Sequence, residues 1–154
     1  MPDNLTKEQR SYNMSRITGK NTKPEMLVRK FLHSKGFRYR LYDITLPGKP
    51  DIVFIKYRTV IFVHGCFWHG HANCKYFAIP KSNKGYWIEK IGKNVVRDKI
   101  YTIGLKELGF TVIIIWECQL KPKRINKTLE ALVRRLCLIK TQKIKNVRLE
   151  NQHK

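Results

Sequence analysis

The chain has 154 residues and carries 32 Lys and Arg against 11 Asp and Glu, a formal net charge of +21 at pH 7. This length suits one domain that can bury a core without disulfides or oligomerisation, so we expect a monomer. A net charge this large is far from that of an ordinary enzyme, whose surface is close to neutral. The sequence shows neither a secretory signal nor an apolar run of membrane-spanning length, so a cytoplasmic protein without membrane association is expected.

Positive charge is spread along the whole chain. Residues 1–120 hold 21 basic and 9 acidic residues, and residues 121–154 hold 11 and 2. A nucleic acid is the expected partner of this basic body, because Lys and Arg gain affinity there by releasing condensed counterions. A solvated basic surface and attraction to anionic lipid are the alternatives, and charge alone does not separate them.

The N-terminal part predicts two helices. A short one is expected over residues 7–17 of a polar arm. The next begins at Thr22, an N-cap residue followed three positions later by Glu25, which would complete a capping box. It is predicted to end at Gly36, where a left-handed residue can terminate a helix.

Four runs rich in β-branched and aromatic residues predict strands over residues 37–41, 51–55, 60–64 and 111–116. Turn-length gaps separate the first three runs, so neighbouring strands there are expected to be antiparallel. The fourth run is continuously apolar after its first residue, which predicts a strand covered on both faces of the sheet.

Two later helices complete the predicted fold, over about residues 84–108 and 126–140. Helices alternating with strands in this way predict a single α/β domain with a mixed central sheet flanked by helices. We expect an N-terminal arm over residues 1–20, the folded domain over 21–140, and a basic, frayed tail over 141–154.

Asp51 opens the second predicted strand and is the one acid between Asp43 and Glu89. A carboxylate in such a place is either a turn or cap residue or an oxygen ligand for a divalent cation facing a phosphate. Position alone favours the turn or cap. The segment after the next strand favours the cation site, because residues 64–74 hold three histidines, two cysteines and two adjacent large aromatic residues.

The four cysteines are read as thiols or metal ligands, because disulfides are rare in a reducing cytoplasm. Cys66, His71 and Cys74 have the ligand types and loop spacing of a zinc site. Cys118, just past the buried strand, is the best candidate for the fourth ligand, whereas Cys137 looks like a core residue of an amphipathic helix. A closed set of four would make the zinc structural; ordinary buried thiols are the alternative.

The other two histidines of the loop flank it at His64 and His69. A lone histidine is usually a core residue. Two beside a candidate metal carboxylate are better interpreted as acid/base groups or phosphate contacts for phosphodiester hydrolysis, which also needs a cation to stabilise charge.

Phe67 and Trp68 would normally be core residues. Because they lie between Cys66 and His69 in a metal-tethered loop, both rings are not expected to turn inward together. Exposed rings on a basic protein can enter and unstack a base step. Trp87, at the start of the long helix, either joins them or anchors the core.

These residues fall in four ordered motifs: LPGKPD at 46–51, HGCFWH at 64–69, Trp87 with EKIGKN at 89–94, and WEC at 116–118. Together they resemble the very short patch repair (Vsr-type) endonucleases over roughly residues 10–135. The resemblance implies a restriction-endonuclease-like fold with catalytic Mg²⁺ and structural Zn²⁺. It implies nicking of one DNA strand 5′ to the T of a T:G mismatch left by deamination of 5-methylcytosine, alongside mismatch repair proteins.

The resemblance also implies roles for individual residues. The catalytic set would be Asp51, His64, His69, Glu25 and Asp98. Magnesium would be held by Asp51 and the backbone carbonyl of Val63. Zinc would be held by Cys66, His71, Cys74 and Cys118. DNA would be contacted by Phe67, Trp68, Trp87, Lys90, Lys93 and Asn94.

Two departures from the pattern of related nucleases remain. Val63 stands where restriction-type nucleases usually have an acidic side chain, and His64 follows it. The gap from His71 to Cys74 is one residue longer than in some members, so either Asn73 forms a bulge or the zinc ligands differ. The alternatives in function are a magnesium-dependent nuclease of the same fold with another target, and a non-catalytic, zinc-stabilised DNA-binding module.

Overall fold

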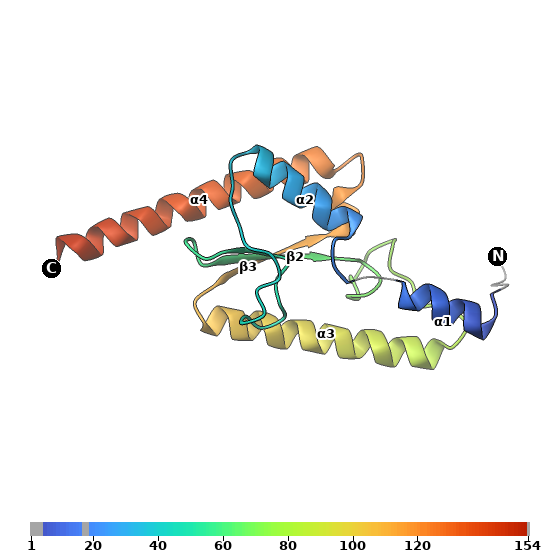
Figure 1. The fold of residues 1–154 in the computed structure, drawn as a ribbon. Coiled ribbons are helices and arrows are strands. Elements are labelled where there is room, and N and C mark those ends of the chain that lie inside the picture. Colours follow the sequence, from blue (N-terminus) through green and yellow to red (C-terminus); the bar gives the residue numbers. More distant parts are fainter. Residues whose placement is uncertain (1–4, 17–18, 154) are drawn as a thin grey trace.

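The structure is a computed structural model and describes residues 5–16 and 19–153. Its elements are, in chain order, α1 (Lys7–Ser15), α2 (Lys23–Ser34), β1 (Ile52–Phe54), β2 (Thr59–His64), α3 (Lys84–Glu107), β3 (Thr111–Trp116), the 3₁₀ helix η1 (Glu117–Leu120) and α4 (Ile125–Gln152). The sheet forms the middle layer, with α2 and α4 on one face and α3 on the other (Figure 1). The expected mixed α/β architecture is confirmed.

The sheet of the described chain has three strands in the order β1-β2-β3. β1 and β2 pair antiparallel, with Ile52 opposite Ile61, as the short gap between them predicts. β2 and β3 pair parallel, with His64 opposite Trp116. The start of β1 and the ends of β2 and β3 therefore lie at the same end of the sheet, which is where the candidate site is built.

The prediction of a strand over residues 37–41 is wrong. The backbone there makes a single antiparallel bridge, in which Arg40 and Val53 exchange hydrogen bonds of 2.9 and 2.8 Å. Tyr42 then adopts a left-handed conformation with φ of 49°, which ends the extended run. Phe37 and Tyr39 instead pack edge-on against Phe54 of the core.

The helix boundaries agree closely with the sequence signals. α1 begins at the predicted residue, and the predicted end at position 17 lies outside the described residues. In α2, Thr22 Oγ1 accepts a bond from the Glu25 N–H at 3.4 Å, but the Glu25 carboxylate does not return it. Only half of the predicted capping box forms, because that carboxylate is bound elsewhere. Gly36 follows the helix with φ of 85°.

Two apolar clusters fill the layers. The larger lies between the sheet and α2 with α4, and includes Val28, Phe54, Ile113 and Leu132; the smaller lies under α3 around Leu105. The prediction that β3 is covered on both faces is only half right, because Ile114 is 37% exposed on its α3 side. β3 is an edge strand, so that side is only partly covered.

The last helix is longer than predicted. α4 begins one residue before the expected start and continues to Gln152, so the frayed tail expected beyond Lys140 is helical instead. Its second half projects past the rest of the molecule in Figure 1. Lys, Arg, Leu and Gln are good helix formers, so a packed helix can propagate through them. No helix of the described chain has the length and apolar character needed to cross a membrane.

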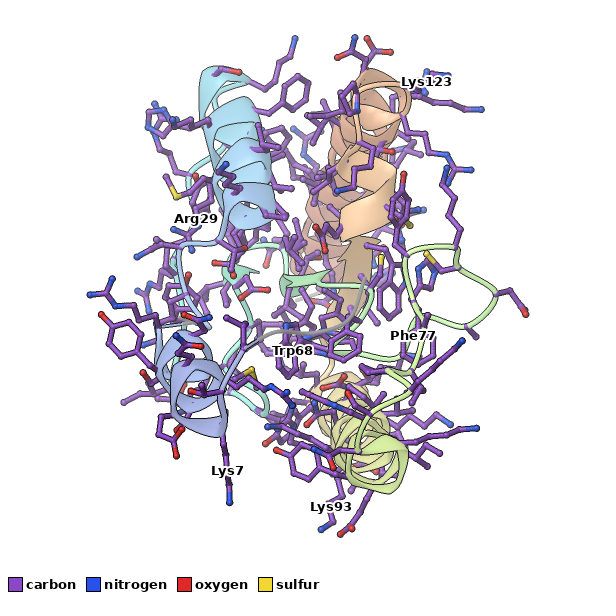
Figure 2. All side chains as sticks on the ribbon, turned by 90° about the vertical axis from the view of Figure 1, so that its right-hand side faces the viewer. Lys7, Arg29, Trp68, Phe77, Lys93 and Lys123 are labelled. Atoms are coloured by element: carbon purple, nitrogen blue, oxygen red, sulfur yellow. The ribbon has the colours of Figure 1, made fainter. Side chains whose placement is uncertain are left out.

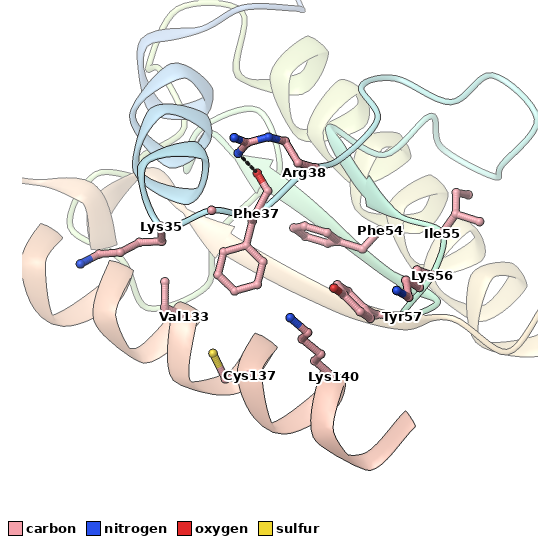
Figure 3. A pocket seen from close by; sticks show the side chains of 11 residues that line it. Lys35, Phe37, Arg38, Phe54, Ile55, Lys56, Tyr57, Val133, Cys137 and Lys140 are labelled. Atoms are coloured by element: carbon pink, nitrogen blue, oxygen red, sulfur yellow. Dashed lines mark hydrogen bonds between the residues drawn. The ribbon is translucent and has the colours of Figure 1, made fainter. Parts of the chain in front are cut away.

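Two hollows lie at opposite ends of the sheet. The larger, about 860 Å³, is at the end where β1 starts and β2 finishes. The smaller, about 450 Å³, lies between the end of α2, the turn after β1 and the middle of α4 (Figure 3). None of the predicted catalytic, metal or DNA-binding residues lines the smaller hollow.

Candidate active site and metal centre

Asp51 lies immediately before β1 and lines the larger hollow, which we call the cleft. Its Oδ2 accepts a 2.7 Å hydrogen bond from the backbone N–H of Val63, so the acid is tied to β2. Burial, reinforced by the negative charge of Glu25, raises the pKa of Asp51 to about 7. The nearby Arg29 and His69 act to lower this pKa but do not offset the burial, and a bound divalent cation would supply further positive charge.

His64 ends β2 and is buried, while His69 lies five residues later in the loop and remains partly exposed. Their rings stack with centroids 3.8 Å apart and planes within 2° of parallel. Burial, and then the nearby His69, lowers the pKa of His64 to about 4, so its ring is neutral at neutral pH. Its Nδ1 is buried without a hydrogen-bond partner in the described structure.

Asp98 on α3 orients the second ring. His69 Nδ1 donates to Asp98 Oδ2 at 2.6 Å, and both side chains remain partly accessible from the cleft. A carboxylate on one imidazole nitrogen fixes the tautomer and leaves the other nitrogen to move a proton. The structure thus brings Asp51, His64, His69 and Asp98 to one cleft.

Glu25 also lines the cleft, but it is engaged by residues that the sequence analysis did not single out. Its Oε2 accepts hydrogen bonds from Arg29 at 2.9 Å and from the hydroxyl of Tyr42 at 2.5 Å. The Glu25–Arg29 spacing of four residues on a helix was a readable signal for an ion pair. No local signal indicated Tyr42, because it comes from a separate loop.

The predicted aromatic residues form one cluster at the loop after β2. Phe67 lies 5.1 Å from Trp68 and 5.3 Å from Trp87 between ring centroids, and the two Trp rings are 6.0 Å apart. Phe77, which the sequence analysis did not predict, joins at 6.5 Å from Phe67. Figure 2 looks onto this end of the molecule, with Trp68 near its centre. All four rings are partly exposed.

Residues of α3 hold this aromatic loop. Asn94 donates a 3.0 Å hydrogen bond from Nδ2 to the carbonyl of Trp68. Lys90 Nζ lies over the Trp68 and Trp87 rings at 5.6 and 5.9 Å. Gly70 has φ of 59° and lies so close to α3 that a Cβ would come within 2.8 Å of Val95. The loop can therefore pack on α3 only with glycine there.

Lys93 is placed differently from the other predicted DNA-binding residues. Its side chain is well exposed on α3, where it pairs with Glu89 at 2.6 Å one helical turn away. It does not join the aromatic cluster. Exposed pairs of this kind break readily, so the charge remains available to a polyanion.

Cys66, His71, Cys74 and Cys118 form the second group at this end. Their ligand atoms all lie within 4.8 Å of one another, and Cys118 Sγ is 3.5 Å from His71 Nδ1. Asn73 has φ of 55°, the left-handed bulge that accommodates the long spacing before Cys74. These separations and this soft donor set fit a tetrahedral zinc ion.

The three cysteines of this group differ in protonation. Burial acts to raise the pKa of Cys74, but hydrogen bonds from the Tyr76 backbone and from Cys66 lower it overall. Burial raises the pKa of Cys66 to about 12 and also raises the pKa of Cys118. Their thiolates would therefore need a positive charge, and a metal ion supplies one. Cys137 lies outside the group, as expected, but it is exposed on α4 and is not the core residue predicted.

The family model and the relatives that match this chain indicate the same protein family. The family model of the DNA mismatch endonuclease Vsr matches residues 2–75. The type II nicking enzyme V.NmeAIP of Neisseria meningitidis serogroup A is 53% identical over 88% of this chain and 97% of its own length. The DNA mismatch endonuclease Vsr of Escherichia coli K12 is 45% identical over 88% of this chain and 86% of its own.

A third relative, the type II nicking enzyme V.XorIIP of Xanthomonas oryzae pv. oryzae, is 48% identical over 78% of this chain and 88% of its own length. These matches extend over most of the chain and confirm the family resemblance carried by the four motifs. The chain therefore belongs to the Vsr family of DNA mismatch endonucleases.

Proposed function

We propose that this protein is a magnesium-dependent endonuclease that nicks one strand of duplex DNA 5′ to the T of a T:G mismatch. The observation that carries the proposal is the shared cleft of Asp51, hydrogen-bonded to the Val63 N–H, and the His69–Asp98 pair stacked on the buried His64 ring. Membership of a family of DNA mismatch endonucleases supports the mismatch as the substrate feature.

In this proposal Asp51 and the backbone carbonyl of Val63 hold Mg²⁺, with Glu25 nearby. The cation, when bound, would stabilise charge on the scissile phosphate and lower the pKa of the attacking water. Asp98 keeps His69 in one tautomer, so that its free Nε2 accepts or donates a proton during hydrolysis. The neutral His64 ring supports His69 from below and contacts the phosphate.

The other predicted residues serve binding. Phe67, Trp68 and Trp87 would unstack the base step at the mismatch, which costs least where the pair is already weakened. Lys90, Lys93 and Asn94 would contact the same DNA from α3. A zinc ion on the four Cys and His ligands would do no chemistry but would fix the loop that joins the aromatic cluster to the catalytic histidines.

The remaining expectations are part of the same proposal. The protein would be a monomer that acts in the cytoplasm alongside mismatch repair proteins. A single domain with a basic surface fits this role. We place the nuclease domain at residues 21–140, preceded by an arm over 1–20 and followed by the basic tail over 141–154. In that tail, α4 continues as a helix.

A nicking assay tests the proposal. Zinc-loaded protein is incubated with Mg²⁺ and a T:G duplex labelled on the T strand, or its T:A control. A single nick 5′ to the T in the mismatched duplex alone is expected. Asp51→Asn should abolish nicking while leaving duplex binding intact. Equal cutting of both duplexes would refute mismatch specificity.

Two alternatives are distinguished by the same assay. Several relatives are named type II nicking enzymes, so a nuclease of the same fold with another target would nick some other duplex in a Mg²⁺-dependent way. A non-catalytic DNA-binding module would bind duplexes without cutting any. The cleft carboxylate of Asp51 disfavours the second alternative, because a pure binder of a polyanion gains nothing from a buried acid there.

A further inference from the structure

We propose that Tyr42 is a positioning residue that, with Arg29, holds the Glu25 carboxylate for the cation bound at Asp51. The inference rests on the proposed function, in which Asp51 binds Mg²⁺. It assigns to this chain a set of contacts in the wall of the cleft that orient an acid, with Tyr42 and Glu25 both lining the cleft.

The hydrogen bonds to the Glu25 carboxylate all reach one of its two oxygens. The Asn21 N–H at 3.0 Å, the Arg29 guanidinium at 2.9 Å and the Tyr42 hydroxyl at 2.5 Å all reach Oε2. Among the described residues no donor is recorded on Oε1. A carboxylate held by three donors on one oxygen has little freedom to rotate, and its second oxygen stays available. Glu25 is only 3% exposed, yet it lines the same cleft as Asp51.

The Tyr42 hydroxyl is the centre of this arrangement. It donates to Glu25 and accepts bonds from the Asn21 N–H at 2.8 Å and from the Arg29 guanidinium. Arg29 also binds Asn21 Oδ1 at 2.7 Å. The hydroxyl therefore joins the first turn of α2 to the loop before β1, the two segments that carry Glu25 and Asp51.

The backbone conformation of Tyr42, the turn that follows it and two neighbouring cations all hold this residue in place. Its φ of 49° is uncommon for a bulky residue. The following turn is closed by Asp43, whose Oδ1 accepts bonds from the Thr45 N–H and hydroxyl at 2.9 and 2.6 Å. Lys20 Nζ and the Arg29 guanidinium each lie 5.0 Å from the ring centroid. A left-handed backbone conformation of a bulky residue persists where the surrounding contacts hold it in place.

Arg29 supplies the charge that this arrangement needs. A buried carboxylate without a cation is costly, and removing one partner of a buried pair leaves the other uncompensated. Arg29, 6% exposed, neutralises Glu25 in the absence of metal and so permits Glu25 to lie in the same cleft as Asp51. Tyr42 then sets the direction of the carboxylate, because its hydroxyl bonds to both partners.

The test measures metal binding without cleavage. Full-length zinc-loaded protein is titrated with Mn²⁺, followed by electron paramagnetic resonance, as a substitute for Mg²⁺. Tyr42→Phe is expected to weaken Mn²⁺ binding roughly tenfold, the equivalent of about one hydrogen bond to a charged group. The Mg²⁺ concentration for half-maximal nicking should rise equally, with the rate at saturating Mg²⁺ near that of the wild type.

Tyr39→Phe is the matched control. Its hydroxyl binds the backbone carbonyl of Arg29 at 2.9 Å and does not contact Glu25, so Mn²⁺ affinity should stay unchanged. Glu25→Gln keeps the shape of the acid and gives a second test that does not need the Tyr42 variant to fold. Glu25→Gln should weaken Mn²⁺ binding at least as much as Tyr42→Phe does. The double variant Tyr42→Phe/Glu25→Gln should bind Mn²⁺ as tightly as Glu25→Gln alone.

Wild-type Mn²⁺ affinity in Tyr42→Phe would overturn the proposal, and so would additive losses in the double variant. Mn²⁺ binding that does not depend on Asp51 would overturn it as well. The first two outcomes leave the proposed function standing. A failure of the proposed function would show instead as Mn²⁺ binding that does not depend on Asp51, or as an absence of nicking by a wild-type protein that still binds Mn²⁺ at Asp51.

Discussion

The ring of His69 lies flat on the ring of His64, with centroids 3.8 Å apart. One ring ends a buried strand and the other belongs to a partly exposed loop. Asp98 holds the outer ring from α3. The candidate acid/base group is therefore assembled from three separate elements, and each can be tested by a substitution that leaves the other two in place.

Asp98→Asn is expected to lower the nicking rate about 100-fold or more, the usual contribution of an oriented acid/base group. The amide can present its NH₂ group to Nδ1 and so favour the wrong tautomer of His69. Substrate KM should change little, because Asp98 is proposed to act through His69. Glu107→Gln, the same change at an exposed position of α3, is the control and should keep the wild-type rate. An undiminished rate in Asp98→Asn would show that His69 needs no partner.

Asp51→Asn is expected to raise the melting temperature of the magnesium-free protein at pH 8. The pKa of Asp51 is raised from 3.8 to about 7, so folding favours its protonated form. Such a group contributes stability below its unfolded pKa and loses it as pH rises through the folded pKa. The wild type therefore loses stability between about pH 4 and pH 7, and the amide variant does not.

Melting curves from pH 4 to 8 check this prediction. The gain should reach at least about 3 °C at pH 8 and shrink towards zero near pH 4. Added Mg²⁺ should stabilise the wild type at pH 8 and have no such effect on the variant. A melting difference that stays constant across this range would mean that Asp51 is not desolvated as described.

Cys118→Ala is expected to lower the melting temperature by about 10 °C or more and to release the bound zinc, since metal binding to such a site is coupled to folding. Wild-type protein should hold about one zinc ion per chain by elemental analysis. Cys137→Ala is the matched control, because Cys137 is exposed on α4 and lies outside the ligand group. Full zinc content and unchanged melting in Cys118→Ala would rule out this ligand set.

Trp68→Ala is expected to weaken binding to a T:G duplex by about 1–3 kcal/mol, the range for loss of one base–aromatic stack. Binding to the T:A duplex should change less, so the mismatch preference should fall. Fluorescence anisotropy with both duplexes measures this. Tyr76→Ala removes another exposed ring, two residues after Cys74 and outside the Phe67–Trp68–Trp87 cluster, and should keep the preference. Equal weakening on both duplexes would assign Trp68 to general affinity.

Much of the fold was predictable from local signals. Thr22 and Gly36 bracket α2, and the apolar run before Trp116 marks β3, because caps, glycines and apolar spacing act within a few residues. The absent strand over residues 37–41 shows the limit. Its β-propensity was real, but a strand needs a partner edge, and the turn at Tyr42 leaves room for one bridge only.

The candidate metal ligands combine a local sequence signal with a contact that only the tertiary structure makes. The spacing of Cys66, His71 and Cys74 is local and could be read directly from the chain. Cys118 is far away in sequence and reaches them through the parallel pairing of β2 with β3. His64 lies opposite Trp116, so Cys66 and Cys118 each follow two residues after a paired position.

The sequence by itself determined the family, the basic body and the identity of the chemical groups, since residue types, motifs and charge do not depend on the fold. Only the tertiary structure decided which groups meet. The Asp98 partner of His69, the Tyr42 and Arg29 partners of Glu25 and the exposed side of β3 all follow from strand order and helix packing. Contacts of that kind join distant segments, where local propensity carries no information.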